Sequence, residues 1–584
     1  MAKEKSNLET MRHSLSHVLA MAVLDMFPEG KLAIGPAIDN GFYYDFDLPR
    51  TLIPEDLPIL EKKMKHIVKQ NLKFERQDVP VDEALKISKK AKQPYKTELV
   101  EDLKKAGKKT VSFYKTGSFV DLCEGPHVES TNKLGAFTLS HTAGAYWKGD
   151  EKNKMLQRIY AYAFETQKEL DEFLKNQEEL KKRDHRKIGK DMDLFCFSAL
   201  VGAGLPLFTP KGVIIIEELK KHVEKLCSDY GFQKISTPAL ANIKLFEISG
   251  HKQKFGDELF HVTSKHKQKI VLRPVTCPHM GQVYASRPRS YRDLPIRYME
   301  SDKMFRAEKP GEVGGLNRVY AITVEDGHTF CRVDQVKEEV KGLVKIIKEF
   351  YTSLGMFDEF WVSLSFRDPK TPEKYIGDTK DWETCEKMLK EVSKEMGLNA
   401  KVCEGEAALY GPKIDFQFKA ISGKEFAIPT VQLDFSTPKS FGLVYTDEKG
   451  KDVHPVMVHR AILGSYERFF VLLLEHFAGD FPLWLAPVQV KVIPVSDKFE
   501  KFAKTIEAEL KAANIRVEFD ESDESVGKKI RNAEMQKIPY MLVLGEKEVK
   551  SKKLAVRSRK YGDLGQIDIK KLIEKLKKEI GDKK

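Results

Sequence analysis

The amino-acid sequence predicts an α+β protein of several domains, in which a central antiparallel β-sheet is flanked by helices. The chain has 584 residues, whereas a single domain usually has about 100–200. A densely charged helical stretch separates an N-terminal region of mixed helical and strand signals from the rest. Strand-like apolar runs with Gly/Pro turns follow, and then strands and helices alternate regularly. We therefore expect domains at residues 1–164, 191–486 and 487–584, with a connector helix at 165–190.

Composition limits the function classes. The 99 Lys and Arg exceed the 87 Asp and Glu by 12, which favours a polyanionic partner. No apolar run reaches the ~18 residues of a membrane span, and the N-terminal residues lack the apolar stretch of a secretory signal. Seven cysteines are scattered without a disulfide-like framework. We expect a soluble, cytoplasmic protein without a membrane partner.

Two pairs of potential ligands or catalytic groups lie in the first domain. His13 and His17 are four residues apart in the helical stretch "RHSLSHVLA", so both rings project from one helical face. Cys123 and His127 are also four apart, in "VDLCEGPHV". Three imidazoles and a thiol could form a tetrahedral zinc shell or act without a metal. The residues alone leave both interpretations open, as well as the alternative of buried structural histidines.

The connector is predicted from "ETQKELDEFLKNQEELKKRDHRKIGK" at residues 165–190. Leu170, Phe173, Leu174 and Leu180 recur at helical intervals among dense charges. This pattern is typical of an exposed amphipathic helix that joins two domains.

The third region, residues 191–486, contains the strand-like runs "MDLFCF", "KIVLRP", "WVSLSF" and "KIDFQF". In "MFRAEKPGEVGGLNRVYAITVEDGHTF" we expect two strands around a Gly-rich turn, with Arg306 and Glu308 on one strand face and Arg318 on the second strand. In "VMVHRAILGSYERFF", His459 and Arg468 flank a strand-to-helix switch. Arginines that rise from such a sheet suit a triphosphate, because the guanidinium fork matches phosphate oxygens. A P-loop is excluded, because GxxxxGK[ST] does not occur.

The last region, residues 487–584, alternates strands and helices: "VKVIPV", "KFEKFAKTIEAELKAA", "RVEFD", "GKKIRNAEMQ", "YMLVLG" and "KLAVRSR" precede a basic C-terminal helix. This order predicts a compact α/β domain of roughly a hundred residues.

These segments resemble the class II aminoacyl-tRNA synthetases, and among them the threonyl-tRNA synthetase family, from about residue 11 to the end. "YGFQKISTPAL" resembles motif 1, with Pro238 at the dimer interface of that family. "RYMESDKMFRAE" with "GGLNRV" resembles motif 2, and "VHRAILGSYERF" resembles motif 3. Many bacterial members begin with a small ubiquitin-like domain, for which the sequence before the histidine pair has no room. The resemblance implies a homodimer that attaches L-threonine to tRNA(Thr) through a threonyl-adenylate made from ATP and Mg²⁺.

The resemblance also implies the residues of the synthetic site. One Zn²⁺ per chain would be held by three residues from separate motifs: Cys277, His328 and His459. A packed cysteine or a hydrogen-bonded histidine is the alternative for each of them alone. Three protein ligands leave the coordination shell open, and in the family the amino and hydroxyl groups of threonine complete it. Valine, the isostere without the hydroxyl, would then be rejected.

Further residues of that site also follow from the family motifs. The residues implied for threonine are Asp326, Tyr410 and Gln432. Those implied for ATP are Arg306, Glu308, Arg318 and Arg468, with Lys413 at the α-phosphate; the catalytic set is Arg306, Arg468 and Lys413. The sequence departs from the family pattern at four nearby positions: Ile322 in place of an adenine-stacking phenylalanine, Val324 in place of a common glutamine, and Ala427 and Ile428 in place of Gln-Cys.

Zinc cannot reject serine, which keeps both ligating groups and lacks only a methyl worth ~1–3 kcal/mol. The family accordingly has a second, editing site that hydrolyses seryl-tRNA. The residues that match it are His13, His17, Asp121, Cys123 and His127, with Lys96 as a further candidate. The related alanyl-tRNA editing domain has zinc in this pattern, whereas the threonyl family is understood to act without a metal. We expect metal-free editing here.

The C-terminal region resembles the anticodon-binding domain of several class II enzymes, which implies contacts from Arg531, Glu548 and Arg557. Asp523 stands where an asparagine is frequent. Two other hypotheses are a non-catalytic paralogue that binds RNA and a synthetase for another amino acid, such as proline or serine. The motif arginines argue against the first, and the three zinc ligands together with the editing pattern argue against both.

Overall fold

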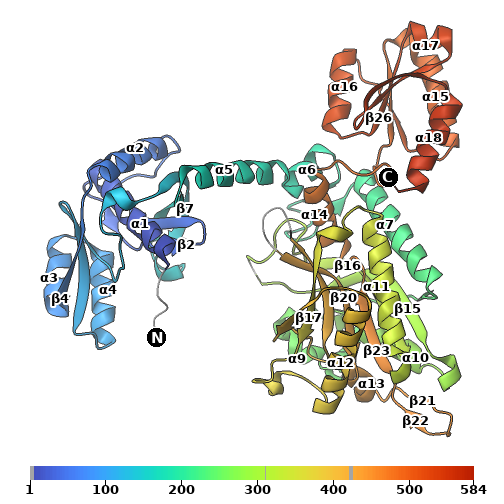
Figure 1. Cartoon of the computed structure of the whole chain (residues 1–584), viewed down its shortest axis with the longest axis horizontal. Helices are drawn as coiled ribbons and strands as arrows, with labels where there is room; N and C mark the ends of the chain where they lie inside the picture. The colour runs from blue at the N-terminus through green and yellow to red at the C-terminus, as the bar shows by residue number, and fades with distance from the viewer. Residues whose placement is uncertain (1–5, 267, 310, 420–424, 584) are drawn as a thin grey trace. The chain divides into compact units, whose positions relative to one another are not determined.

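The computed structural model describes residues 6–266, 268–309, 311–419 and 425–583 of the chain (Figure 1). Its internal contacts divide it into two units, Met1–Glu179 and Leu180–Lys584. Both combine helices with largely antiparallel sheets, as the sequence predicts. In the described residues, no helix combines the length and the apolar character that crossing a membrane requires.

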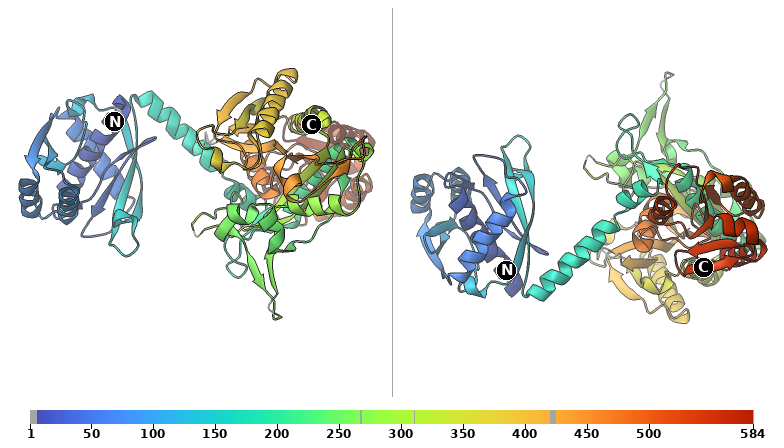
Figure 2. Two further views of the ribbon diagram at one scale, coloured as in Figure 1. Left: turned by 90° about the horizontal axis from the view of Figure 1, so that it is seen from below. Right: turned by 90° about the horizontal axis from the view of Figure 1, so that it is seen from above.

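The first unit has two sheets. The larger follows the order β1-β3-β8-β7, and helix α1 packs on it through Leu15, Leu19, Phe42 and Ile159. The smaller has the order β4-β5-β6 and is covered by α3 and α4 (Figures 1 and 2). The bounds are α1 (Asn7–Met26), β1 (Lys31–Leu32), β3 (Gly41–Asp47), α2 (Asp56–Lys69), β4 (Phe74–Pro80), α3 (Val81–Lys90), α4 (Pro94–Lys105), β5 (Thr110–Thr116), β6 (Phe119–Leu122), β7 (Ala136–Tyr146) and β8 (Met155–Phe164).

Helix α1 begins at a complete capping box. The Ser6 hydroxyl accepts from the Glu9 amide at 3.2 Å, and the Glu9 carboxylate accepts from the Ser6 amide at 2.9 Å. The helix carries buried residues on most of its surface, because the large sheet and α2 both pack against it. This packing holds His13 and His17 inside the unit.

The connector predicted as one helix over residues 165–190 is two helices. Helix α5 spans Gln167–Lys182, and α6 spans His185–Asp191. The break falls at Asp184, whose side chain accepts from the Arg186 amide at 2.8 Å and so caps α6. Apolar spacing does not reveal this break, because an Asp inside a charged helix and an Asp at an N-cap look alike in the pattern.

The second unit is built on an eight-stranded sheet of order β11-β15-β16-β23-β20-β19-β17-β18. It is antiparallel except at its two edge pairs, β11–β15 and β17–β18. Helices α7, α11 and α14 contribute to the large apolar core that packs on it. The bounds are α7 (Pro210–Asp229), β11 (Gln233–Lys234), β15 (Ile296–Phe305), β16 (Ala321–Cys331), α11 (Val336–Thr352), β17 (Phe360–Phe366), α12 (Thr379–Glu395), β18 (Lys401–Glu404), β19 (Lys413–Lys419), β20 (Glu425–Asp434), β23 (Val456–Ala461) and α14 (Tyr466–Phe477).

Two of the predicted strands lie outside this sheet. "MDLFCF" contributes only β9 (Phe195–Cys196), which pairs with β10 (Leu207–Phe208). "KIVLRP" contains β14 (Lys269–Leu272), the centre of a small sheet with β12 (Leu240–Asn242) and β13 (His261–Thr263). Helix α10 (Cys277–Ala285) follows that sheet.

The C-terminal part of the second unit has a five-stranded sheet of order β25-β24-β26-β27-β28, parallel over its first three strands. The predicted α/β domain is confirmed, with two further elements that the sequence reading missed, α17 and β28. The bounds are β24 (Val490–Pro494), α15 (Glu500–Ala512), β25 (Val517–Phe519), α16 (Val526–Met535), β26 (Tyr540–Leu544), α17 (Glu546–Ser551), β27 (Leu554–Ser558), β28 (Gly562–Ile567) and α18 (Ile569–Gly581).

Candidate functional site

Strand register aligns several of the predicted residues in a row across the central sheet. His328 of β16 lies opposite His459 of β23, and His459 lies opposite Gln432 of β20. Gln432 in turn lies opposite Lys413 of β19. Because directly paired residues project from the same face of a sheet, these four side chains share one face. Residues up to 131 positions apart in the chain are thereby brought side by side.

The cysteine and the two histidines form a buried donor cluster. The ligand atoms of Cys277, His328 and His459 all lie within 4.8 Å of one another. His328 Nε2 is 2.8 Å from His459 Nδ1, so these two nitrogens face the same point. One thiolate and two imidazoles are a donor set that suits zinc. The three residues therefore fit the ion that the family resemblance implies.

Asp434 orients one of these imidazoles. Its Oδ2 is 2.9 Å from His459 Nε2, which leaves His459 Nδ1 to face His328. The carboxylate is fully buried and also accepts from the amides of Ser436 and Thr437. A carboxylate behind a ligating histidine fixes its tautomer and raises its basicity. "TVQLDFS" is part of the resemblance, but no residue in the pattern marks Asp434 as a partner of His459.

The predicted threonine residues lie beside the donor cluster. Tyr410 stacks on His459 with ring centroids 4.7 Å apart and donates to Gln432 Oε1 at 2.8 Å. Asp326 is two residues before His328 on β16, and it hydrogen-bonds to Thr276, the residue before Cys277. Burial raises the pKa of Asp326 to about 6, against the lowering effect of the Thr276 hydrogen bond. A carboxylate, an amide and a phenol therefore lie next to members of the donor cluster: Asp326 two residues before His328, Gln432 opposite His459, and Tyr410 stacked on His459.

Arg306, Glu308 and Arg318 lie in the turn between β15 and β16, not on the strands as predicted. Strand β15 ends at Phe305 and β16 begins at Ala321. Arg318 is 2.6 Å from Glu308 and 3.0 Å from Glu312, so the turn is held by its own ion pairs. Arg306 lies over the Phe255 ring at 5.1 Å, and burial lowers the pKa of this guanidinium. The two-residue alternation that predicted a strand continues past the end of β15, where the Glu308 amide donates to the Arg306 carbonyl at 3.0 Å in a tight turn.

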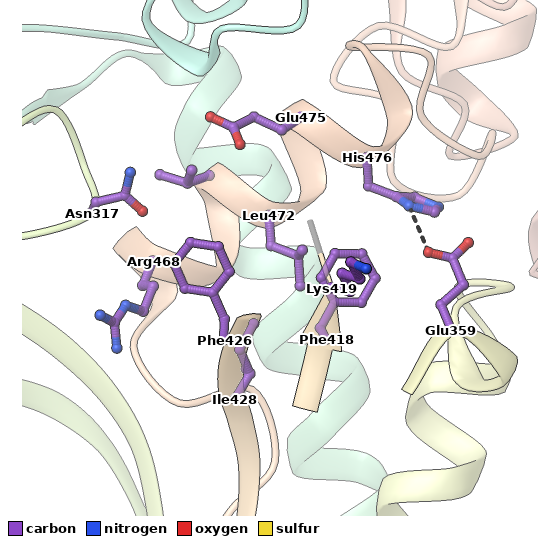
Figure 3. A pocket seen from close by; sticks show the side chains of 11 residues that line it. Asn317, Glu359, Phe418, Lys419, Phe426, Ile428, Arg468, Leu472, Glu475 and His476 are labelled. Carbon is purple, nitrogen blue, oxygen red and sulfur yellow. Dashed lines mark ion pairs between the residues drawn. The ribbon is translucent and has the colours of Figure 1, made fainter. Parts of the chain in front are cut away.

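Arg468 lies in the first turn of α14, where Ser465 caps the helix by accepting from the Arg468 amide at 3.3 Å. Its guanidinium is 5.9 Å from the Phe426 ring. Figure 3 shows Arg468, Phe426 and Asn317 lining one pocket. Lys413 is 3.0 Å from Asp415 on the same strand. The cationic side chains implied for ATP, here called the motif cations, thus come from three places: Arg306 and Arg318 from the β15–β16 turn, Lys413 from β19 and Arg468 from α14.

Three of the four departures from the family pattern can be placed relative to this site. Ile322 and Val324 precede Asp326 by four and two residues on β16, so all three share one strand face. Ile428 lines the pocket of Figure 3, whereas Ala427 is exposed. The first two departures therefore lie on the face that carries the predicted substrate residues.

The first unit holds a second cluster, made from α1 and the loop after β6. Cys123 Sγ is 2.9 Å from His13 Nε2 and 3.3 Å from His127 Nε2. His127 Nδ1 is 3.0 Å from the Ser14 hydroxyl. The ligand atoms of His13, His17, Cys123 and His127 lie within 4.8 Å of one another, so this set also has the geometry of a metal shell.

A buried charge network adjoins this cluster. Lys96 Nζ is 2.7 Å from Asp121 Oδ1, and the Tyr44 hydroxyl donates to Asp121 Oδ2 at 2.7 Å. His17 Nε2 is 4.0 Å from the same carboxylate. Burial, with smaller effects of His13 and Lys96, lowers the pKa of His17 well below its usual range, so this imidazole is neutral near pH 7. An open pocket of about 890 Å³ borders Cys123, and its charged lining residues are Arg76, Lys108, Lys109, Asp78, Asp102 and Glu124.

Sequence reasoning missed Tyr44 and Ser14 in this cluster. The alternation in "GFYYDFD" does place Tyr44 on the same face as Phe42 and Phe46, which are both buried. Ser14 follows His13 directly and is buried on α1. Inward position alone predicts packing, and only the fold reveals the partners of these hydroxyls.

The three predicted anticodon residues occupy different environments in the C-terminal domain. Arg531 is exposed on α16, and Arg557 is exposed on β27 opposite Met541. Glu548 is buried on α17, where it accepts from the Gly545 amide at 2.9 Å and from the Gln566 side chain at 3.1 Å. In this structure Glu548 caps its own helix.

Models of known families match three parts of the chain. The model described as tRNA synthetase class II core domain (G, H, P, S and T) matches residues 260–477. The model of the anticodon binding domain matches residues 489–579. The model of the threonyl and alanyl tRNA synthetase second additional domain matches residues 111–160, which include Cys123 and His127.

Individual relatives match over almost the whole length. A threonine–tRNA ligase of Clostridium tetani is 46% identical over 99% of this chain and 89% of its own. One from Gloeobacter violaceus is 46% identical over 99% of this chain and 93% of its own. A crystal structure of the RNA binding domain of threonyl-tRNA synthetase from Cryptosporidium parvum matches with a TM-score of 0.64 and 32% identity, covering 68% of this chain and 98% of that one. The chain belongs to the threonine–tRNA ligase family.

Proposed function

We propose that the chain activates L-threonine with ATP, transfers it to tRNA(Thr), and hydrolyses seryl-tRNA(Thr) made in error. The observation that carries the synthetic part is the row His328, His459 and Gln432 across the sheet, with Cys277 and Asp326 beside it. The direct test is attachment of labelled threonine to tRNA(Thr) by the purified protein. The proposal fails if the protein charges no tRNA with threonine.

We propose that Cys277, His328 and His459 bind one Zn²⁺ per chain. An ion with three protein ligands has an open coordination shell, which the amino and hydroxyl groups of threonine would complete as a fourth and a fifth ligand. Asp326 accepts hydrogen bonds from the amino group of the substrate, and Tyr410 and Gln432 close the pocket around the side chain. A substrate without the hydroxyl leaves polar groups of the site unpaired, which is far costlier than a missing methylene.

ATP is proposed to bind along the motif cations together with Mg²⁺. Arg306 and Lys413 stabilise the charge that develops on the α-phosphate, and Arg318 with Glu308 and Arg468 hold the remainder of the nucleotide. The threonine carboxylate attacks the α-phosphorus, the bond to the bridging oxygen breaks, and pyrophosphate leaves. Positioning and charge stabilisation suffice for this step, so no protein nucleophile is needed.

The cluster in the first unit is proposed to hydrolyse the ester of seryl-tRNA without a metal. Neutral His17 and the His13–Cys123–His127 cluster can accept a proton from an attacking water. Lys96, held by Asp121, supplies a positive charge for the oxyanion of the tetrahedral intermediate. Among the charged residues of the adjoining pocket, Arg76, Lys108 and Lys109 are the candidates for contacts with phosphates at the 3′ end of a tRNA.

Three further properties belong to the proposal. Exposed Arg531 and Arg557 are candidates for anticodon bases or phosphates, and Glu548 would have to leave its capping role to reach a base. The protein is proposed to form a homodimer through the region of Pro238, and sedimentation at several concentrations tests this. A cytoplasmic location is supported by the cysteines, none of which is in a disulfide in the described structure.

A further inference from the structure

His185, the first residue of α6, joins two elements that carry ATP-binding arginines. Its Nδ1 is 2.9 Å from Glu475 Oε1 on α14, and the Leu316 amide donates to its Nε2 at 3.4 Å. The ring is 94% buried, since its exposed fraction is 6%. Because a backbone N–H can only donate, Nε2 is the unprotonated nitrogen and Nδ1 carries the hydrogen toward Glu475.

Each partner of the ring is close in sequence to one arginine. Leu316 is two residues before Arg318 in the β15–β16 turn. Glu475 is seven residues after Arg468 on α14, which corresponds to about 10 Å along the helix axis. Arg183, two residues before His185, donates to the Glu475 and His476 carbonyls at 3.2 and 2.8 Å and so caps the C-terminal turn of that helix. The start of α6 is therefore fastened to the turn and to the helix at once.

The turn is shaped around this ring. Gly315 has φ +53°, and a Cβ added there would lie 2.4 Å from His185 Nε2. His185, Arg318, Arg468 and Glu475 also line one pocket of about 590 Å³ together with Asn317. Figure 3 shows Asn317, Arg468 and Glu475 from the neighbouring pocket, with Arg468 and Glu475 on the same helix. The ring thus lines the same pocket as the two arginines.

We propose that His185 is a positioning residue for ATP, which sets the separation of Arg318 and Arg468 by bonding at once to Leu316 and Glu475. This inference rests on the proposed role of the two arginines in ATP binding. His185 acts through them, and its ring is engaged on both nitrogens, so it contributes geometry and no proton transfer.

Two amide substitutions separate the two bonds of the ring. The Gln side chain in His185→Gln can place an oxygen near the position of Nε2 and accept from the Leu316 amide. The shorter side chain in His185→Asn can reach only the Nδ1 position and donate to Glu475. His185→Ala removes both bonds. His222→Asn, at a half-buried histidine of α7 that bonds to Ser353 and not to the turn, is the matched control.

The measurements are the KM for ATP and for threonine in threonine-dependent ATP–pyrophosphate exchange, corrected for the fraction of active enzyme by a single-turnover burst. We expect His185→Asn and His185→Gln, which each lose one buried hydrogen bond of the ring, to raise the KM for ATP about fivefold to tenfold, and His185→Ala, which loses both, to raise it further. The KM for threonine should stay within twofold in all three variants. His222→Asn should leave both values unchanged.

Direct titration of ATP by calorimetry separates failure of the proposed function from failure of the inference about His185. If the wild-type protein binds ATP but shows no threonine-dependent exchange, the proposed function fails and the binding data on the variants still test His185. An unchanged affinity for ATP in His185→Asn overturns the inference. So does an equal rise in both KM values, because that result indicates general loss of structure. If His185→Ala does not fold, the Asn and Gln variants decide.

Discussion

His459 has all its polar atoms engaged, and this defines what its ring can bind. Asp434 lies behind Nε2, and Nδ1 faces His328 Nε2 in a buried space that also contains Cys277. Tyr410 covers one ring face. The imidazole is thereby oriented before any ion or substrate arrives, which is the preorganisation that a ligating residue needs.

Removing the thiol should remove the metal. In Cys277→Ala, bound zinc should fall from about one per chain toward zero, since two protein ligands hold zinc poorly. Threonine activation should be lost with it. Elemental analysis and pyrophosphate exchange give the two readouts. Cys227→Ala, at a buried cysteine of α7, is the control and should keep its zinc. A Cys277→Ala protein that activates threonine normally would rule out the proposed role of the cluster.

The histidines of the first unit should serve hydrolysis only. The double variant His13→Ala/His17→Ala should activate threonine normally, fail to deacylate preformed seryl-tRNA, and keep its zinc content. The control variant, His141→Ala, changes an exposed histidine of β7 and should deacylate seryl-tRNA normally. Surviving deacylation in the double variant would make the two histidines structural. Loss of deacylation together with one zinc per chain would instead keep the editing role and contradict its metal-free mechanism.

At the scale of elements, α7 and α11 are joined through a half-buried histidine. His222 bonds to Ser353 at 2.8 Å and stacks on Phe350, with ring centroids 5.5 Å apart. Burial, together with Lys583 and Lys225, lowers the pKa of His222 to about 4. The packed helices therefore favour the neutral ring.

This burial predicts a pH dependence of stability. Between pH 6.5 and 4 the unfolded chain binds a proton at His222 and the folded chain does not, so the free energy of unfolding falls as the pH falls through this window. The loss from this group should not exceed about 3 kcal/mol. His222→Phe should reduce the drop in melting temperature of the second unit between pH 7 and pH 5. If both proteins lose the same amount, His222 does not cause the dependence.

Sequence patterns predicted these elements unequally. The strands of "WVSLSF" and "KIDFQF" and the α/β order of the last domain were right, because buried strands and amphipathic helices carry their periods in the sequence. The break at Asp184 and the turn that contains Arg306 and Arg318 were not predicted. An N-cap residue and a turn can show the same residue spacing as the helix or strand beside them. Motif resemblance named the site residues, but the alignment of His328, His459 and Gln432 depends on strand register. Partners such as Asp434 and Tyr44 follow only from the fold.

At the scale of the whole molecule, two clusters of similar chemistry lie in two different units. One has Cys277 and two histidines on a sheet of the second unit, and the other has Cys123 and three histidines around α1 in the first. We propose that the Cys277 cluster selects against valine, and that the Cys123 cluster removes serine from tRNA. Neither site can do both, because a hydroxyl ligand distinguishes threonine from valine but not from serine.

ATP–pyrophosphate exchange across amino acids tests this central claim most directly. The wild-type protein should support exchange with threonine and, more weakly, with serine, whereas valine at the same concentration should give no signal above background. The His13→Ala/His17→Ala variant should give the same three results, because editing acts after activation. Valine-dependent exchange near the threonine level would contradict the account, since a site that requires a hydroxyl cannot activate an amino acid without one.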